Sequence, residues 1–138
     1  MKLISCVFVL ALLVSGCGGG NSSPTAPSAN VPFSTVDLRV GTGATATTVP
    51  PVTVNYSGWL WNSGGVDNKG TRFDAGTLSI TPTQSVISGF SQGIVGMRVG
   101  GLRRVTIPPS LGYGAAGRPP AIPGNSTLIF EIELVSIP

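Results

Sequence analysis

Histidine is absent from the 138-residue sequence, and cysteine occurs only as Cys6 and Cys17. Without histidine the chain has no imidazole for acid–base catalysis or metal binding, and no Ser-His or Cys-His nucleophile pair. Because both cysteines precede residue 18, the rest of the chain has neither a disulfide nor thiol chemistry. Any reaction assigned to this protein must proceed without these groups.

Charged residues are also scarce, at 9% of the sequence, and the net charge is only +3. The basic residues are scattered apart from the pair Arg103 and Arg104, which we expect on a solvent-exposed face of a strand. A nucleic-acid-binding protein normally carries a basic stripe, so we expect no nucleic-acid partner. Glycine (20) and proline (12) are abundant instead. This composition is typical of a β-rich domain with many turns.

The N-terminal apolar run is too short to cross a bilayer as a helix, which takes about 20 residues. Residues 3–13 (LISCVFVLALL) follow Lys2 and have the features of a secretory signal peptide. The pattern VSGC at 14–17 resembles the bacterial lipobox, whose cysteine becomes the acylated N-terminus of the mature protein. We therefore expect residues 1–16 to be a lipoprotein signal peptide and Cys17 to be lipidated. An ordinary signal peptide that happens to end near a cysteine is the alternative.

The resemblance to lipoproteins also implies a location. Position 18 is Gly rather than Asp, which in Gram-negative lipoproteins favours sorting to the outer membrane. We expect an exported protein, anchored by lipid to the bacterial outer membrane and facing the periplasm. In a host with a single membrane, the same anchor would face outward from that membrane. Residues 17–33 are rich in Gly, Ser, Pro and Asn, and we expect them to form a flexible linker to a domain at 34–138.

Hydrophobic periodicity in that domain predicts several strands and one helix. Alternation indicates strands at 36–40, 52–61, 103–107 and 127–137, with shorter extended pieces at 71–74 and 77–81. Residues 88–97 have helical spacing with Ser88 as the expected N-cap, but three glycines make this a poor helix. The helix therefore needs a sheet to pack against, and the sequence predicts an α+β domain.

Six segments resemble, in the same order, the motifs of the FKBP-type peptidyl-prolyl cis/trans isomerases. They are VNYSG at 54–58, TRFD at 71–74, VISGF at 86–90, the stretch 93–107, PPSLGYGAAG at 108–117 and IPGNSTLIF at 122–130. Together they extend over nearly all of residues 36–138. The resemblance implies a five- or six-stranded antiparallel sheet wrapped around one short helix. It also implies an enzyme that accelerates rotation about X-Pro bonds without a cofactor or metal.

The resemblance further implies which residues form the site. The catalytic positions are Tyr56, Phe73, Asp74, Ile87, Tyr113 and Phe130, and the substrate-binding positions are Leu78, Val86, Phe90 and Ile122. In these roles Phe73 touches the proline ring, whereas the Ile87 N–H and the Tyr113 hydroxyl donate to substrate carbonyls. Without the resemblance, Phe90 and Phe130 are ordinary core residues, and Asp74 is a turn residue.

The sequence departs from the family pattern at several of these positions. Phe90 stands where the family has Trp, and Leu78 stands where it has Phe. Residues 75–77 supply no arginine to pair with Asp74. Arg118 and Ala121 occupy variable rim positions of the family and are candidates for setting substrate preference.

Three functions therefore remain open on the same fold. One is an isomerase of exported proteins, and another is a binding module or chaperone that holds proline-containing segments with little turnover. The third is a surface lipoprotein that acts on host proteins, which nothing in the sequence separates from the first. The expected partners are proline-containing polypeptides, macrolides such as tacrolimus or rapamycin, and a membrane reached through the lipid anchor. We expect the protein itself to be a monomer.

Overall fold

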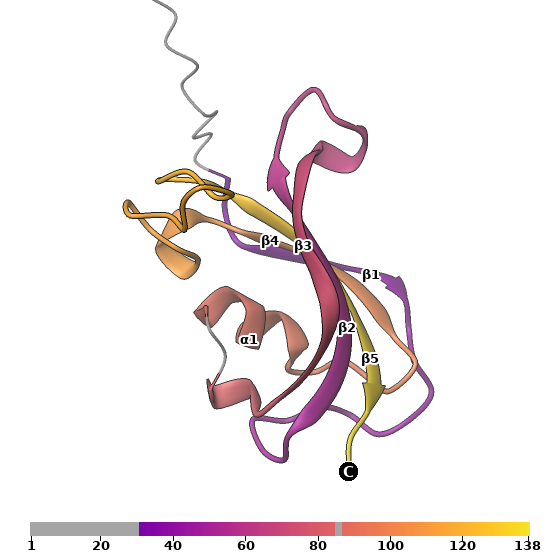
Figure 1. Cartoon of the computed structure of the whole chain (residues 1–138). Coiled ribbons are helices and arrows are strands. Elements are labelled where there is room, and N and C mark those ends of the chain that lie inside the picture. Colours follow the sequence, from indigo (N-terminus) through magenta and orange to yellow (C-terminus); the bar gives the residue numbers. More distant parts are fainter. Residues whose placement is uncertain (1–30, 85–86) are drawn as a thin grey trace, which may run out of the picture.

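The computed structural model describes residues 31–84 and 87–138, so Cys17 and Val86 lie outside the described residues. The described chain forms strands, one α-helix and short 3-10 turns (Figure 1). These elements are β1 (Ser34–Arg39), β2 (Val52–Trp61), η1 (Val66–Asn68), β3 (Lys69–Ile80), η2 (Pro82–Gln84), α1 (Ser88–Ile94), β4 (Leu102–Ile107), η3 (Pro109–Leu111) and β5 (Leu128–Ser136).

The strands form one antiparallel sheet in the order β1-β4-β5-β2-β3. The sheet curves around α1, which lies on its concave side (Figure 1). This arrangement confirms the predicted α+β fold. The prediction of two separate extended pieces at 71–74 and 77–81 was wrong, because residues 71–74 and 77–80 belong to the single 12-residue strand β3, which ends at Ile80.

The core lies between the concave face of the sheet and α1. Because side chains alternate along a strand, Glu131 and Glu133 of β5 point away from the core, and the residues between and beside them are buried. The buried apolar side chains that meet in the core include Val52, Val54, Phe90, Ile94, Val105, Ile107, Leu128, Phe130, Ile132 and Leu134.

Two of the glycines that give α1 its poor helix propensity allow it to lie close to β4. A Cβ atom on Gly89 would be 2.5 Å from a side-chain carbon of Ile107, and one on Gly93 would be 2.6 Å from Val105. Both distances are shorter than any ordinary contact between carbon atoms. Packing against the sheet therefore holds this helix, as its composition led us to expect.

The helix begins and ends differently from the prediction. Ile87 occupies the N-cap position, whereas Ser88 is the first helical residue and donates its hydroxyl to the carbonyl oxygen of Leu111 at 3.5 Å. The helix ends at Ile94 rather than at residue 97. Just beyond it, Gly96 has a φ of +86°, a left-handed conformation that does not continue a helix.

Arg103 connects three elements, and the prediction that it is solvent-exposed was wrong. Its side chain is only 13% exposed, and its Nε lies 2.6 Å from Oδ1 of Asp37 in β1. Its Nη1 donates to the carbonyl oxygens of Gly93 and Val95 at the end of α1, at 3.0 and 3.2 Å. The hydrogen bond from Arg103 lowers the pKa of Asp37 below its ordinary value. Through this ion pair and these hydrogen bonds, Arg103 connects both β1 and α1 to β4.

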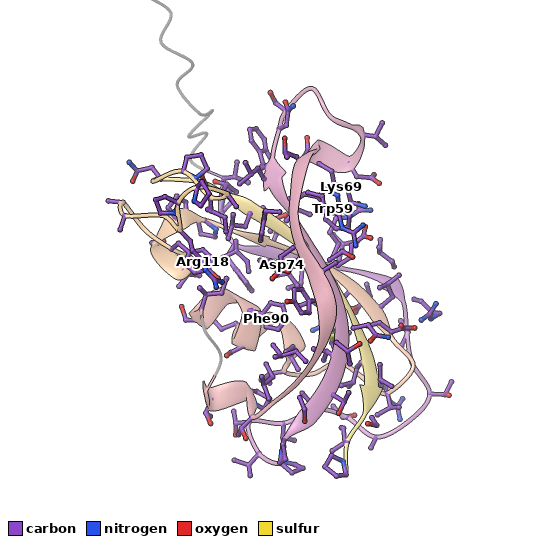
Figure 2. All side chains as sticks on the ribbon, in the orientation of Figure 1. Trp59, Lys69, Asp74, Phe90 and Arg118 are labelled. Atoms are coloured by element: carbon purple, nitrogen blue, oxygen red, sulfur yellow. The ribbon has the colours of Figure 1, made fainter. Side chains whose placement is uncertain are left out.

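Arg104 belongs to an ion-pair cluster on the convex face of the sheet. Its Nη2 lies 2.9 Å from Oδ2 of Asp67 and 3.0 Å from Oε1 of Glu131. The same Glu131 oxygen lies 2.5 Å from Nζ of Lys69, which is 4.3 Å from the ring centroid of Trp59 (Figure 2). The cluster links four strands on the face opposite α1, and so supports the part of the sheet that carries the site.

Candidate active site

Two adjoining cavities open between the concave face of the sheet, α1 and the loop that joins β4 to β5. Their volumes are about 230 and 320 Å³, and Asp74, Tyr113, Arg118 and Phe130 line both of them. The smaller cavity is also lined by Tyr56, Leu78, Ile87 and Phe90, and the larger by Phe73, Pro119, Pro120, Ala121 and Ile122. Because the cavities share four residues, we describe them as two compartments of one site. Asp74 and Phe90 lie at this site in Figure 2.

Four aromatic rings form the apolar lining. Phe90 and Phe130 are buried, and their ring centroids are 5.2 Å apart. Tyr56 lies 5.8 Å from Phe90, and Phe73 lies 5.5 Å from Phe130, both edge to face. Edge-to-face pairs contribute about 0.5–1.5 kcal/mol each beyond the burial of their surface. The rings therefore hold one another in fixed orientations.

Phe73 and Asp74 are neighbours in β3, yet both line the site, which a regular strand does not allow. The register between β2 and β3 shifts here, because Gly58 pairs with Asp74 and Trp59 pairs with Arg72. Phe73 is thus the extra residue of a β-bulge, a feature that re-aims side chains and is common beside active sites. The bulge presents a ring and a carboxylate to the same cavity.

Gly58 makes room for this arrangement on the neighbouring strand. A Cβ atom on Gly58 would lie 2.7 Å from Cζ of Phe73 and 2.8 Å from Cε1 of Phe130. Any larger residue would displace one of the two rings. From the sequence Gly58 was only one letter of a motif, although a glycine inside a strand often marks such a close approach.

Asp74 finds its hydrogen-bond partners within the site. Tyr56 donates its hydroxyl to Oδ2 at 2.8 Å, and the backbone N–H of Ala75 donates to Oδ1 at 2.9 Å. A phenol and a backbone amide thus take the place of the arginine that residues 75–77 lack. Burial, and then the hydrogen bond to Asp74, raise the pKa of Tyr56 above its ordinary value of 10.0. The phenol therefore stays protonated at neutral pH and continues to hold the carboxylate.

Tyr113 and Ile122 reach the site from the loop between β4 and β5. Arg118 and Ile122 in this loop exchange two backbone hydrogen bonds, of 2.8 and 3.1 Å. Ile122 is only 2% exposed, which fixes this side of the loop against the core. Nη1 of Arg118 donates to the Tyr113 hydroxyl oxygen at 3.4 Å.

Every predicted site residue within the described ranges lines at least one of the two compartments. Those residues are Tyr56, Phe73, Asp74, Leu78, Ile87, Phe90, Tyr113, Ile122 and Phe130. Val86 lies outside the described residues, and the roles of all these side chains toward a substrate remain predictions. Pro119 and Pro120 also line the larger compartment, and their adjacency in the sequence was the one signal that the rim there is stiff.

Comparison with known proteins shows the family of this chain. Residues 43–135 match the model of the family described as FKBP-type peptidyl-prolyl cis-trans isomerase. An FK506-binding protein from Neisseria meningitidis serogroup A is 42% identical over 101 residues, which cover 73% of this chain and 92% of that protein. The chain belongs to the FKBP-type peptidyl-prolyl cis-trans isomerases, and is an enzyme of that type.

Two further comparisons support the fold and set its extent. A crystal structure of a peptidyl-prolyl cis-trans isomerase from Pseudomonas syringae has a TM-score of 0.64 and 32% identity, covering 75% of this chain and 74% of that one. A 46 kDa FK506-binding nuclear protein from Spodoptera frugiperda is 43% identical over 106 residues. That match covers 73% of this chain but only 24% of the larger protein.

Proposed function

We propose that the site accelerates rotation about X-Pro bonds in exported or envelope polypeptides by binding the twisted amide in its aromatic pocket. The observation that carries this proposal is the cluster of four rings around a cavity with a carboxylate, the hydroxyl of Tyr56 and the phenol of Tyr113 at its edge. X-Pro rotation has a barrier of about 18–20 kcal/mol, because the amide must lose its planarity. No bond is made or broken, so a chain without histidine or a reactive thiol is suited to this reaction.

The physical basis of the rate is a difference in polarity. A twisted amide has lost its resonance and is less polar at nitrogen, so an apolar pocket that excludes water favours it over the planar ground state. In the proposed arrangement the proline ring packs against Phe73, Phe90 and Phe130, and the Tyr113 hydroxyl donates to a substrate carbonyl. Asp74, held in place by Tyr56, stabilises the twisted amide electrostatically.

Isomerisation and its inhibition by a macrolide test this proposal together. The purified protein should accelerate cis–trans exchange of the Xaa-Pro bond in a peptide, measured by NMR exchange spectroscopy. Tacrolimus or rapamycin should inhibit this isomerisation competitively. Inhibition should be weaker than for family members with Trp and Phe, because Phe90 and Leu78 offer less contact area. A folded protein that neither catalyses exchange nor binds a macrolide at micromolar concentration would contradict the proposal.

We further propose that Cys17 is lipidated and tethers the domain to the outer membrane, facing the periplasm. The lipobox-like VSGC pattern at 14–17 and Gly at position 18 support this location. In the part of the chain that the structure describes, no helix has the length and apolarity needed to span a membrane.

Cys17→Ser should therefore move the protein from the membrane fraction to the soluble fraction, or leave its signal peptide uncleaved. The matched control is Cys6→Ser, which changes the other cysteine inside the expected signal peptide and should leave anchoring intact. Fractionation of expressing cells with immunoblotting measures both. The lipidation proposal fails if the Cys17→Ser protein is cleaved and still sediments with membranes.

A further inference from the structure

Arg118 lies at the mouth of the site on a loop whose backbone is fixed. Gly117 donates its N–H to the carbonyl oxygen of Tyr113 at 3.2 Å, and Arg118 exchanges two backbone hydrogen bonds with Ile122. Two prolines follow Arg118 and stiffen the rim further. Figure 2 shows the Arg118 side chain across the opening from Asp74 of β3. The guanidinium is therefore carried on a stiff support beside the cavity.

The side chain of Arg118 has unused hydrogen-bonding capacity. Its Nη1 donates to the Tyr113 hydroxyl oxygen, and its guanidinium carbon lies 5.9 Å from the Tyr113 ring centroid. A guanidinium has five N–H donors, and this hydrogen bond uses one of them. Within residues 31–84 and 87–138, Arg103 and Arg104 have carboxylate partners but Arg118 has none. A guanidinium is a cation at any physiological pH, and the hydrogen bond to Tyr113, followed by the nearby charge of Asp74, raises the pKa of Arg118 further.

The two charged groups that line the described part of the site attract each other through space but form no ion pair within 4 Å. Among the described residues that line the two compartments, Arg118 is the one cation and Asp74 is the one anion. Both oxygens of Asp74 already accept hydrogen bonds, from Tyr56 and from the Ala75 N–H. Asp74 is thus engaged within the protein, whereas the exposed Arg118 offers its remaining donors to whatever enters the cavity.

We propose that Arg118 recognises an acidic side chain next to the isomerising proline, so that the enzyme favours X-Pro segments flanked by Asp or Glu. This inference rests on the proposed isomerase function and names a substrate class for it. A guanidinium presents paired donors that match a carboxylate. Because Arg118 is exposed, we expect the preference to be modest, at about two- to fivefold in kcat/KM.

Steady-state kinetics with matched peptides tests the proposal. In three otherwise identical peptides the residue before proline is Glu, Gln or Lys, and in three others the residue after proline is varied in the same way. The enzymes are the wild type, Arg118→Gln, Arg118→Glu and the control Arg98→Gln. Arg98 is also exposed, but its side chain donates to the Gly43 carbonyl oxygen outside the site.

At one of the two positions, before or after proline, the kcat/KM for the Glu peptide divided by that for the Lys peptide should fall. We expect this ratio to fall by about two- to fivefold in Arg118→Gln and by about tenfold in Arg118→Glu. It should stay unchanged in Arg98→Gln, and the wild-type preference should weaken as salt is raised. If Arg118 had only a structural role, its substitution would lower kcat/KM equally for all peptides. Equal Glu-to-Lys ratios in wild type and Arg118→Glu, with activity retained, overturn the charge recognition alone. Absence of isomerisation with every peptide in the wild type overturns the proposed function, and this inference with it.

Discussion

Phe73→Ala is expected to lower kcat/KM for a Xaa-Pro peptide by roughly a hundredfold. Phe73 is half-buried and packs edge to face on Phe130, with ring centroids 5.5 Å apart. Removing it deletes the wall proposed to contact proline and admits water to the place where the twisted amide must be desolvated. Large-to-small substitutions of buried aromatics cost about 3–5 kcal/mol. For the half-buried ring of Phe73 we take about 3 kcal/mol as the loss of transition-state stabilisation. At about 1.4 kcal/mol per tenfold in rate, this loss corresponds to roughly a hundredfold in kcat/KM.

The matched control for this variant is Phe33→Ala. Phe33 is also half-buried against the core, but it lines neither compartment. It should lose stability in urea denaturation while keeping kcat/KM within about threefold once the folded fraction is accounted for. If the two variants lose the same activity per folded molecule, or if Phe73→Ala is unimpaired, then Phe73 does not form the proposed wall.

Gly58→Val is expected to damage stability and activity together. Its Cβ would lie within 3 Å of both Phe73 and Phe130, and overpacking of this kind costs about 1–3 kcal/mol. Because valine has two methyl groups beyond Cβ, we expect a net loss near 2 kcal/mol even after its higher β-propensity, which is worth at most about 1 kcal/mol. Displacement of the two rings should also reduce kcat/KM per folded molecule at least about tenfold.

Gly76→Ala is the control for Gly58→Val. Gly76 lies on the neighbouring strand β3 opposite Tyr56, and a Cβ there would be 3.8 Å from the Tyr56 ring, an ordinary contact. The Gly76→Ala substitution should leave the free energy of unfolding unchanged or raise it slightly, since replacing glycine restricts the unfolded chain. Urea titration and peptide exchange kinetics measure both variants. Wild-type stability and activity in Gly58→Val would mean that the packing of the two rings does not depend on Gly58.

The fold could be read from the sequence wherever one periodicity dominated. The alternation in residues 127–137 predicted β5 and its buried face, because one side of that strand faces only core. The weak helix propensity of 88–97, set by its glycines, correctly indicated a helix that depends on a sheet. The same glycines gave no indication of which strand the helix contacts, since that depends on the distance between α1 and β4.

The geometry of the site was harder to predict from the sequence, because it depends on pairing between strands. The family motif placed Phe73 and Asp74 in one segment, but periodicity would put them on opposite faces, and only the bulge opposite Gly58 explains why both line the site. Arg103 was likewise unpredictable, because its partners come from β1 and from the end of α1. Without knowledge of these partners, the charge of an arginine predicts a position on the surface.

We infer that the rate of isomerisation comes from desolvation and positioned donors, without proton transfer. The most direct measurement is the pH profile of kcat/KM from pH 6 to 8, for the wild type and for Tyr113→Phe. We predict a nearly flat profile, because histidine ordinarily titrates in this range and the chain has none. Loss of one hydroxyl donor is worth about 0.5–1.5 kcal/mol, so Tyr113→Phe should lose about tenfold or less. A bell-shaped profile in this range, or complete loss of activity in folded Tyr113→Phe, would rule out this mechanism and point to acid–base catalysis.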